Sequence, residues 1–122
     1  MKILVVDDEE ALRKLVSKTA QRIVQCEVIT AKDGAEGLVL LKREKDFHIL
    51  ITDYEMPRMK GLELIEVARK EFPALKIILM SGTLSEKAVP AGIVFMGKPF
   101  DLATLADLLR NFSGLKDEPL FN

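Results

Sequence analysis

The chain has 122 residues, of which 48% are hydrophobic and 30% are charged, and its formal net charge is −1. These values are typical of one globular domain; they exclude a disordered chain and give no electrostatic reason to expect direct binding to nucleic acid. The apolar run before Asp7 is too short for a signal peptide or a membrane span, and Cys26 is the single cysteine, so we expect a cytoplasmic protein without disulfides or membrane contacts.

Short, wholly apolar runs alternate with longer amphipathic stretches along the chain. Such runs are typical of buried parallel strands, whereas apolar residues three or four positions apart are typical of helices. Several boundaries carry local signals, since Asp33 and Glu36 form a capping box, Pro73 ends a helix, and Asp101 caps the last helix. The expected elements are strand 3–6, helix 9–23, strand 27–30, helix 33–43, strand 47–51, helix 61–72, strand 77–80, strand 93–96 and helix 101–112.

The segment between the last two strands is expected to contain only a short helix. Residues 83–86 have the capping-box sequence Thr-Leu-Ser-Glu, but Pro90 disfavours helical geometry at Val89, which leaves roughly one to two turns. A helix this short is marginal without tertiary packing, and Leu84 and Val89 are its main apolar anchors. We therefore expect residues 83–92 to be the softest part of the domain and the easiest to rearrange.

Five strands connected by helices predict a doubly wound α/β fold, with a five-stranded parallel sheet and helices on both of its faces. The strand at residues 27–30 is partly polar and is expected at an edge of the sheet. Residues 1–122 form a single domain in this interpretation, and residues 113–122 form a tail or linker stub. The helical positions expected to face the core are Leu12, Leu15, Val16, Thr19, Ile23, Leu38, Leu41, Leu62, Ile65, Leu102, Leu105, Leu109 and Phe112.

Polar side chains stand at the carboxyl ends of four strands. Asp7 and Asp8 follow the first strand, Asp53 the third, Ser81 the fourth and Lys98 the fifth. Because the strands are parallel, these residues should meet at one edge of the sheet. Two like charges 4 Å apart repel by roughly 4 kcal/mol at an effective dielectric constant near 20, so three carboxylates need a positive partner. Lys98 and Mg²⁺ are the candidates, since oxygen ligands favour Mg²⁺ and the chain has no cysteine or histidine pair for zinc.

A site that combines a metal ion, an ammonium and a hydroxyl is suited to handling a phosphoryl group. The metal and Lys98 would neutralise the phosphoryl oxygens, and Ser81 would donate a hydrogen bond to one of them. Asp53 would be the nucleophile, because it stands at the tip of a central strand, and it would form an acyl phosphate.

These residues resemble the receiver (response-regulator) domain of two-component signalling, including the chemotaxis regulators, over residues 2 to about 112. The resemblance rests on Asp7-Asp8, Asp53 with Met56-Pro57, Ser81-Gly82 and Lys98-Pro99-Phe100. It implies a flavodoxin-like sheet with strand order 2-1-3-4-5 and a cis Lys98–Pro99 peptide. It also implies Mg²⁺ ligation by Asp8, Asp53 and the main-chain carbonyl of Glu55, with Asp7 acting through water.

The resemblance further implies a function. Asp53 would accept phosphate from a sensor histidine kinase or a histidine phosphotransfer protein, and Ser81 and Lys98 would contact the phosphoryl oxygens. The change would reach a downstream protein partner through residues 83–92, the fifth strand and the last helix. Such a domain is not an enzyme in the usual sense, because it catalyses phosphorylation and dephosphorylation of its own Asp53 only. Phe95 stands where the family more often has a tyrosine, and it lacks the hydroxyl that a surface rotamer would use.

Other interpretations of the same residues stay open at the level of sequence. Asp7 and Asp8 could be helix caps, Ser81 could shape a turn, and Lys98 could be a solvated charge. The chain could be a pseudo-receiver, which has the fold without the phosphate chemistry. It could also be a phosphatase of the haloacid-dehalogenase kind, although Glu55 stands where that class has a second aspartate. The lone His48 and Cys26 are expected to be structural.

Overall fold

The structure, a computed structural model, describes residues 1–114. Its strands form one five-stranded sheet in the order β2-β1-β3-β4-β5, and every pair of neighbours is parallel, as predicted. The strands are β1 (Lys2–Val6), β2 (Glu27–Ala31), β3 (Ile49–Asp53), β4 (Lys76–Ser81) and β5 (Val94–Gly97). The helices are α1 (Glu10–Ile23), α2 (Gly34–Glu44), α3 (Gly61–Glu71), α4 (Leu102–Ser113) and a single turn of 3₁₀ helix, η1 (Glu86–Ala88).

The place of each strand in the sheet follows from its sequence. β3 is buried along its whole length, as expected for an apolar run that is covered by helices on both faces. β2 lies at the edge, where its exposed Glu27 and Thr30 remain in contact with water. Val6 of β1 pairs with Thr52 of β3, so the residues that follow them, Asp7 and Asp53, reach the same edge of the sheet in neighbouring positions.

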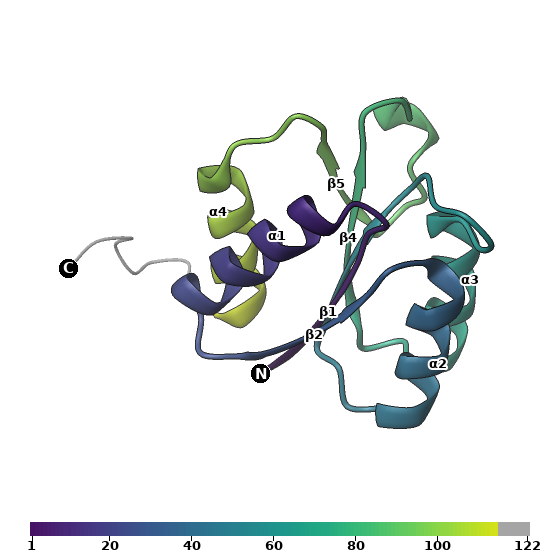
Figure 1. Ribbon diagram of the computed structural model, residues 1–122, viewed down its shortest axis with the longest axis horizontal. Helices are drawn as coiled ribbons and strands as arrows, with labels where there is room; N and C mark the ends of the chain where they lie inside the picture. The colour runs from purple at the N-terminus through teal and green to yellow at the C-terminus, as the bar shows by residue number, and fades with distance from the viewer. Residues whose placement is uncertain (115–122) are drawn as a thin grey trace.

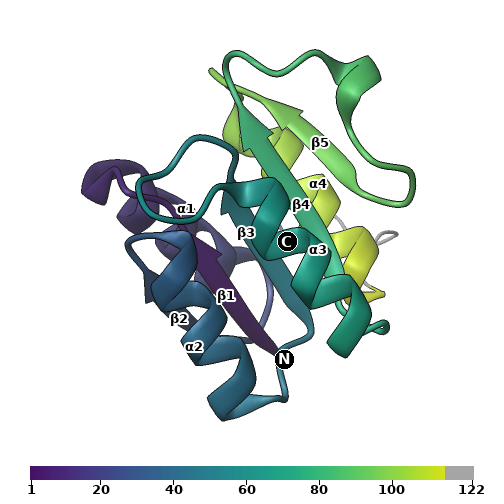
Figure 2. The same ribbon diagram turned by 90° about the vertical axis from the view of Figure 1, so that its right-hand side faces the viewer.

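Two helices cover each face of the sheet: α1 and α4 lie on one side, and α2 and α3 on the other (Figure 1). The view in Figure 2, turned by 90°, places α2 and α3 in front of the strands. Each face has its own hydrophobic core, because successive strand residues point to opposite faces. Leu4 and Val6 pack with the α2 and α3 side, whereas Ile3 and Val5 pack with the α1 and α4 side.

Two leucines predicted to face the core are instead exposed, Leu15 by 44% and Leu102 by 41%. α1 buries Val16, Thr19 and Ala20, and α4 buries Leu105, Ala106 and Leu109. Successive helical residues point about 100° apart, so burial of Val16 turns Leu15 outward, whereas Leu102 is exposed as the first residue of α4. In α3, Leu62 is likewise only half-buried, and Leu64 takes the core position.

The segment between β4 and β5 is short, as predicted, but its helix differs in detail. The turn expected from Thr83 is a 3₁₀ turn that begins at Glu86, and its cap is Ser85, whose hydroxyl accepts a hydrogen bond from the Lys87 N–H at 3.3 Å. The prediction of a capping box opened by Thr83 was therefore wrong, because Thr83 belongs to a separate turn around Ser81. None of the three residues of η1 is buried.

Element boundaries differ from the prediction by one or two residues. β3 begins and ends two residues later than predicted, and Asp53 is its last residue. α4 continues through Ser113, and Gly114 caps it with a φ of 82°. The rest of the expected tail, residues 115–122, lies outside the described residues. Within residues 1–114, no helix combines the length and the apolar character that crossing a bilayer requires.

Candidate functional site

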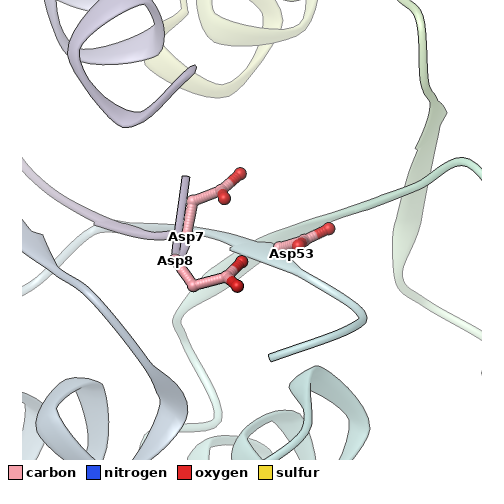
Figure 3. A group of neighbouring side chains, drawn as sticks. All are labelled: Asp7, Asp8 and Asp53. Carbon is pink, nitrogen blue, oxygen red and sulfur yellow. The ribbon is translucent and has the colours of Figure 1, made fainter. Parts of the chain in front are cut away.

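Three carboxylates gather at the carboxyl edge of the sheet (Figure 3). One oxygen from each of Asp7, Asp8 and Asp53 lies within 4.8 Å of the other two. Asp7 is fully buried and Asp53 is 6% exposed, whereas Asp8 lies at the surface. The structure thus brings together the acidic residues that the sequence places at the ends of two strands, and it leaves one side of the group open to solvent.

Lys98 supplies positive charge to this group. Its Nζ lies 3.0 Å from Asp53 Oδ1 and 3.3 Å from Asp7 Oδ2. Burial alone would lower the pKa of Lys98, but the hydrogen bond to Asp53 and the charges of both aspartates outweigh burial and raise that pKa. The Lys98 ammonium therefore stays charged at neutral pH. The Lys98–Pro99 peptide is cis, as the resemblance implied.

Lys98 also borders a surface groove beside the acidic group. The groove has a volume of about 370 Å³, and it is lined by Glu9, Leu12, Leu15, Lys98, Pro99 and Phe100. The exposed Leu15 of α1 is one of its walls. The groove thus adjoins Lys98, whereas Asp7, Asp8 and Asp53 are not among the residues that line it.

Asp53 is destabilised as an anion in the metal-free site. Its burial raises the pKa of Asp53, the hydrogen bond from Lys98 lowers it, and the negative charge of Asp7 raises it again, with a net upward shift. One ammonium thus offsets the cost of burying Asp53 and the repulsion from Asp7 only in part. A second positive charge beside Asp53 would remove the remaining cost.

We expect Asp53→Asn to gain stability relative to the wild type as the pH rises in metal-free buffer. A carboxyl group with a raised folded-state pKa stabilises the fold below its unfolded pKa, about 4, and this contribution is lost as the pH rises through the folded pKa. Asparagine does not titrate, so the difference in unfolding free energy, mutant minus wild type, should increase as the pH rises above about 4 and through the folded-state pKa of Asp53. Urea unfolding of both proteins in the presence of EDTA, at a series of pH values, measures this difference. A difference that falls with pH would contradict the upward shift.

Asp7 is held in place by contacts that the sequence did not predict. Its Oδ1 accepts a hydrogen bond from the Glu9 N–H at 2.8 Å, and its main-chain carbonyl accepts one from Arg13 Nη1 at 2.8 Å. Its N–H donates to the Ala31 carbonyl at 3.1 Å. Arg13 carries no distinguishing signal in the sequence, because a single arginine in an amphipathic helix is typical of a solvated face.

Ser81 is buried at the end of β4, and its hydroxyl is engaged by the turn that follows. Ser81 Oγ accepts hydrogen bonds from the N–H groups of Thr83 at 3.0 Å and Leu84 at 2.9 Å. In the described part of the chain, the Ser81 hydroxyl makes no hydrogen bond to Asp53 or Lys98. Both bonds use lone pairs of this oxygen, so the Ser81 O–H hydrogen can still donate to a phosphoryl group.

Glu55 lies in the loop of residues 54–60, which returns to Asp53. The Tyr54 N–H donates to the Met80 carbonyl at 2.8 Å, and the Gly61 N–H donates to the Tyr54 carbonyl at 3.0 Å. A Cβ atom on Gly61 would lie 2.2 Å from the main-chain oxygen of Asp53, so a side chain at this position would collide with the end of β3. The close approach at Gly61 thus fixes both ends of the loop beside the acidic group.

Three further side chains singled out in the sequence, His48, Cys26 and Phe95, lie outside the acidic group. His48 lies at the opposite edge of the sheet, where its Nδ1 accepts a hydrogen bond from the Lys2 N–H at 3.0 Å. Cys26 is half-buried, and burial raises the pKa of its thiol, which disfavours the reactive thiolate. Phe95 is half-buried in β5, where it pairs with Leu79 of β4.

Residues 3–110 match the family model described as the response regulator receiver domain. A chemotaxis protein CheY homolog from Campylobacter jejuni is 36% identical over 121 residues, which cover 93% of this chain and 93% of the relative. The chemotaxis protein CheY1 of Helicobacter pylori is 34% identical over 124 residues, which cover 96% of this chain and 100% of the relative.

Solved structures show the same likeness. A response regulator receiver domain protein from Clostridium thermocellum superimposes with a TM-score of 0.83 at 26% identity, over 94% of this chain and 95% of that chain. The chemotaxis protein CheY4 of Vibrio cholerae has a TM-score of 0.78 at 32% identity, over 91% of this chain and 97% of that chain. The likeness extends over nearly the whole length of these proteins.

Proposed function

Because this chain belongs to the response regulator receiver domain family, we propose that it is a phosphorylatable switch whose Asp53 accepts a phosphoryl group. Domains of this family are signalling switches rather than classical enzymes. The observation that carries the proposal is the 3.0 Å contact between Lys98 Nζ and Asp53 Oδ1 inside a group of three carboxylates. This arrangement combines a nucleophile with a fixed positive charge. In this proposal residues 1–122 form a single receiver domain.

Asp53 is the nucleophile of the proposed reaction. A carboxylate oxygen of Asp53 attacks the phosphorus of a phosphohistidine, the N–P bond breaks, and the imidazole keeps the electron pair and takes up a proton from water. The donor is a sensor histidine kinase or a histidine phosphotransfer protein. Lys98 and the hydroxyl of Ser81 then contact the phosphoryl oxygens. The switch is reset when water attacks the phosphorus and restores the Asp53 carboxylate with release of inorganic phosphate.

The acidic group fits a Mg²⁺ ion. It offers hard oxygen donors, one from each of three residues within 4.8 Å of one another, on a side open to solvent. We propose that Asp8, Asp53 and the main-chain carbonyl of Glu55 hold the ion, with Asp7 acting through water. When bound, Mg²⁺ supplies positive charge that offsets the repulsion among the carboxylates and the phosphoryl oxygens. The indirect role of Asp7 is consistent with the hydrogen bonds that it accepts from the Glu9 N–H and Lys98 Nζ, one at each carboxylate oxygen.

Removal of Asp8 is expected to weaken Mg²⁺ binding more than removal of Asp7. Asp8→Ala deletes a direct ligand and should raise the dissociation constant by at least about tenfold, whereas Asp7→Ala deletes a contact made through water. The fluorescence of Tyr54 measures Mg²⁺ binding, because Tyr54 adjoins Asp53, is the single tyrosine, and no tryptophan is present. Titration calorimetry gives a second measurement.

Asp107→Ala, which removes an exposed carboxylate of α4 that is 75% accessible, is the control and should bind Mg²⁺ as the wild type does. Because Asp7 is fully buried, the unfolding free energy of each variant is measured alongside the titration. Unchanged affinity in both Asp8→Ala and Asp7→Ala would mean that the acidic pair only caps α1.

The signal is proposed to leave the domain through residues 83–92. This segment starts directly after Ser81 and leads into β5, and its helical turn has no buried residue. A downstream protein partner reads the segment together with β5 and the adjoining face of α4; direct contacts with nucleic acid or membranes are not part of the proposal. The exchange takes place in the cytoplasm, where the lone Cys26 would stay reduced.

A small acyl-phosphate donor with Mg²⁺ tests the proposed function. Intact-mass spectrometry of the wild type should show one phosphoryl adduct, which is lost on treatment with hydroxylamine because an acyl phosphate is labile. Absence of this adduct at saturating Mg²⁺ would overturn the proposal.

A further inference from the structure

The loop of residues 54–60 contains a strained turn at residues 57–59, between the two ends that close at Asp53. The Met59 N–H donates to the Pro57 carbonyl at 2.8 Å, and Arg58 between them has a φ of 70°. A three-residue turn with positive φ at its centre is rare, and a residue with a side chain adopts it only where the surroundings hold it. Some contact outside the loop must therefore support this turn.

The start of α2 supplies that support. The Arg58 guanidinium donates through Nη2 to Oδ2 of Asp33, a side chain that is only 3% exposed. Asp33 Oδ1 accepts a hydrogen bond from the Glu36 N–H at 2.9 Å and so caps α2. The same carboxylate therefore joins the helix and the loop, one through each oxygen.

Main-chain packing brings the same two segments together. A Cβ atom on Gly34 would lie 2.3 Å from the carbonyl oxygen of Met59, so the first residue of α2 must lack a side chain for the loop to lie where it does. Charge reinforces the contact. The hydrogen bond from the Glu36 N–H, together with the weaker effect of the Arg58 guanidinium, holds the pKa of Asp33 below its usual value. Asp33 is therefore an anion at neutral pH, and Arg58 is its side-chain counter-ion.

We propose that Arg58 is a positioning residue for the metal site: its ion pair with the buried Asp33 holds the loop of residues 54–60 in the shape that keeps Glu55 beside Asp53. This inference rests on the proposed function, since Glu55 matters to the site only as a ligand of the metal. Arg58 does not touch the reacting atoms. Arg58 lies three residues after Glu55 in the sequence, and it acts on Glu55 through the loop, both ends of which are held beside Asp53.

Mg²⁺ titration of purified variants tests this proposal. Arg58→Ala should raise the Mg²⁺ dissociation constant about tenfold, the low end of the roughly 10–100-fold loss that follows removal of a contact supporting a metal ligand, because Arg58 acts through the loop and touches no ligand directly. Arg58→Lys should recover part of the affinity, since it restores the charge without the planar fork. Arg22→Ala, which removes an exposed arginine in the last turn of α1, is the control and should match the wild type.

A second pair of variants approaches the same contact from α2. Asp33→Asn keeps an N-cap acceptor and removes the charge, so it should weaken Mg²⁺ binding as Arg58→Ala does, and the double variant should be no weaker than either. Gly34→Ala favours the helix by its own propensity, so a loss of Mg²⁺ affinity in this variant must come from displacement of Met59. Val39→Ala, at a site on α2 that is 59% exposed, is the control for helix stability.

The outcomes separate this inference from the proposed function. Arg58→Ala and Gly34→Ala with the affinity of the wild type, whatever their melting temperatures, would show a merely structural contact and overturn the inference. A wild type that binds Mg²⁺ but takes no phosphoryl group would overturn the proposed function instead. In that case the affinities of the variants would still decide whether Arg58 positions the loop.

Discussion

Asp53→Asn is expected to abolish the phosphoryl adduct that the wild type forms with a small acyl-phosphate donor and Mg²⁺. Asparagine has nearly the same shape as aspartate, so the strand and its neighbours should be retained. Its amide is not a nucleophile, however, and it cannot form an acyl phosphate. Because Asp53 is the carboxylate closest to Lys98, at 3.0 Å, we expect one adduct per chain in the wild type and none in the variant.

Intact-mass spectrometry measures the adduct directly, and peptide mapping of the wild type locates it. Asp107→Asn is the matched control, because it makes the same substitution at an exposed aspartate of α4 that lies outside the acidic group. This control should be labelled as the wild type is. Labelling of Asp53→Asn to the extent of the wild type would show that another residue is the acceptor.

The fold could be predicted because the sequence carries redundant signals for it. Wholly apolar runs are compatible with few positions other than the middle of a parallel sheet, and the run before Asp53 lies there. The helical faces were harder to predict, since Leu15 and Leu102 fit an apolar stripe as well as the residues that are buried. Leu15 is exposed because α1 is rotated to bury Val16, and Leu102 because α4 begins there, and periodicity contains neither the rotation of a helix nor its first residue.

The acidic group could be predicted because parallel strands deliver their carboxyl ends to one edge. The contacts that hold this group could not be predicted, because they join segments that are distant in the sequence and come together only in the folded chain. Arg13 reaches back to the Asp7 carbonyl, and Arg58 crosses from one loop to Asp33 at the start of α2. The hydrogen bonds of the Ser81 hydroxyl could not be predicted either, because its oxygen accepts from the N–H groups of the following turn.

Lys98→Ala is expected to remove most of the structural response to phosphorylation and to destabilise the metal-free protein. Without the ammonium, Asp7 and Asp53 keep their burial but lose their shared counter-charge. Loss of one partner from a buried charge pair costs about 3–5 kcal/mol, and about 1–3 kcal/mol is more appropriate here because the Lys98 side chain is 23% exposed. Mg²⁺ should restore part of this stability, since it binds the folded state and supplies positive charge at the same place.

The structural response of Lys98→Ala should be lost because Lys98 connects Asp53 to the end of β5, so a new charge at Asp53 acts on β5 through Lys98. Its main-chain N–H donates to the Ser81 carbonyl at 2.8 Å, so movement of Lys98 is felt at the end of β4, where the segment 83–92 begins. That segment has few restraints: Leu84 and Val89 are only partly buried, and Arg69 of α3 donates to the Ala91 carbonyl at 2.8 Å. We therefore expect phosphorylation of the wild type to change hydrogen exchange in residues 83–92.

Hydrogen exchange with and without a stable phosphoryl mimic, in the presence of Mg²⁺, compares the two proteins. Lys98→Ala should still bind the mimic, because the carboxylates and the metal remain, yet its change in protection over residues 83–92 should be a small fraction of that in the wild type. Lys18→Ala, which removes an exposed lysine of α1, should respond fully. An equal response in Lys98→Ala would mean that the signal reaches this segment through Ser81 alone, and a response confined to α1 would place the output on the opposite side of the site.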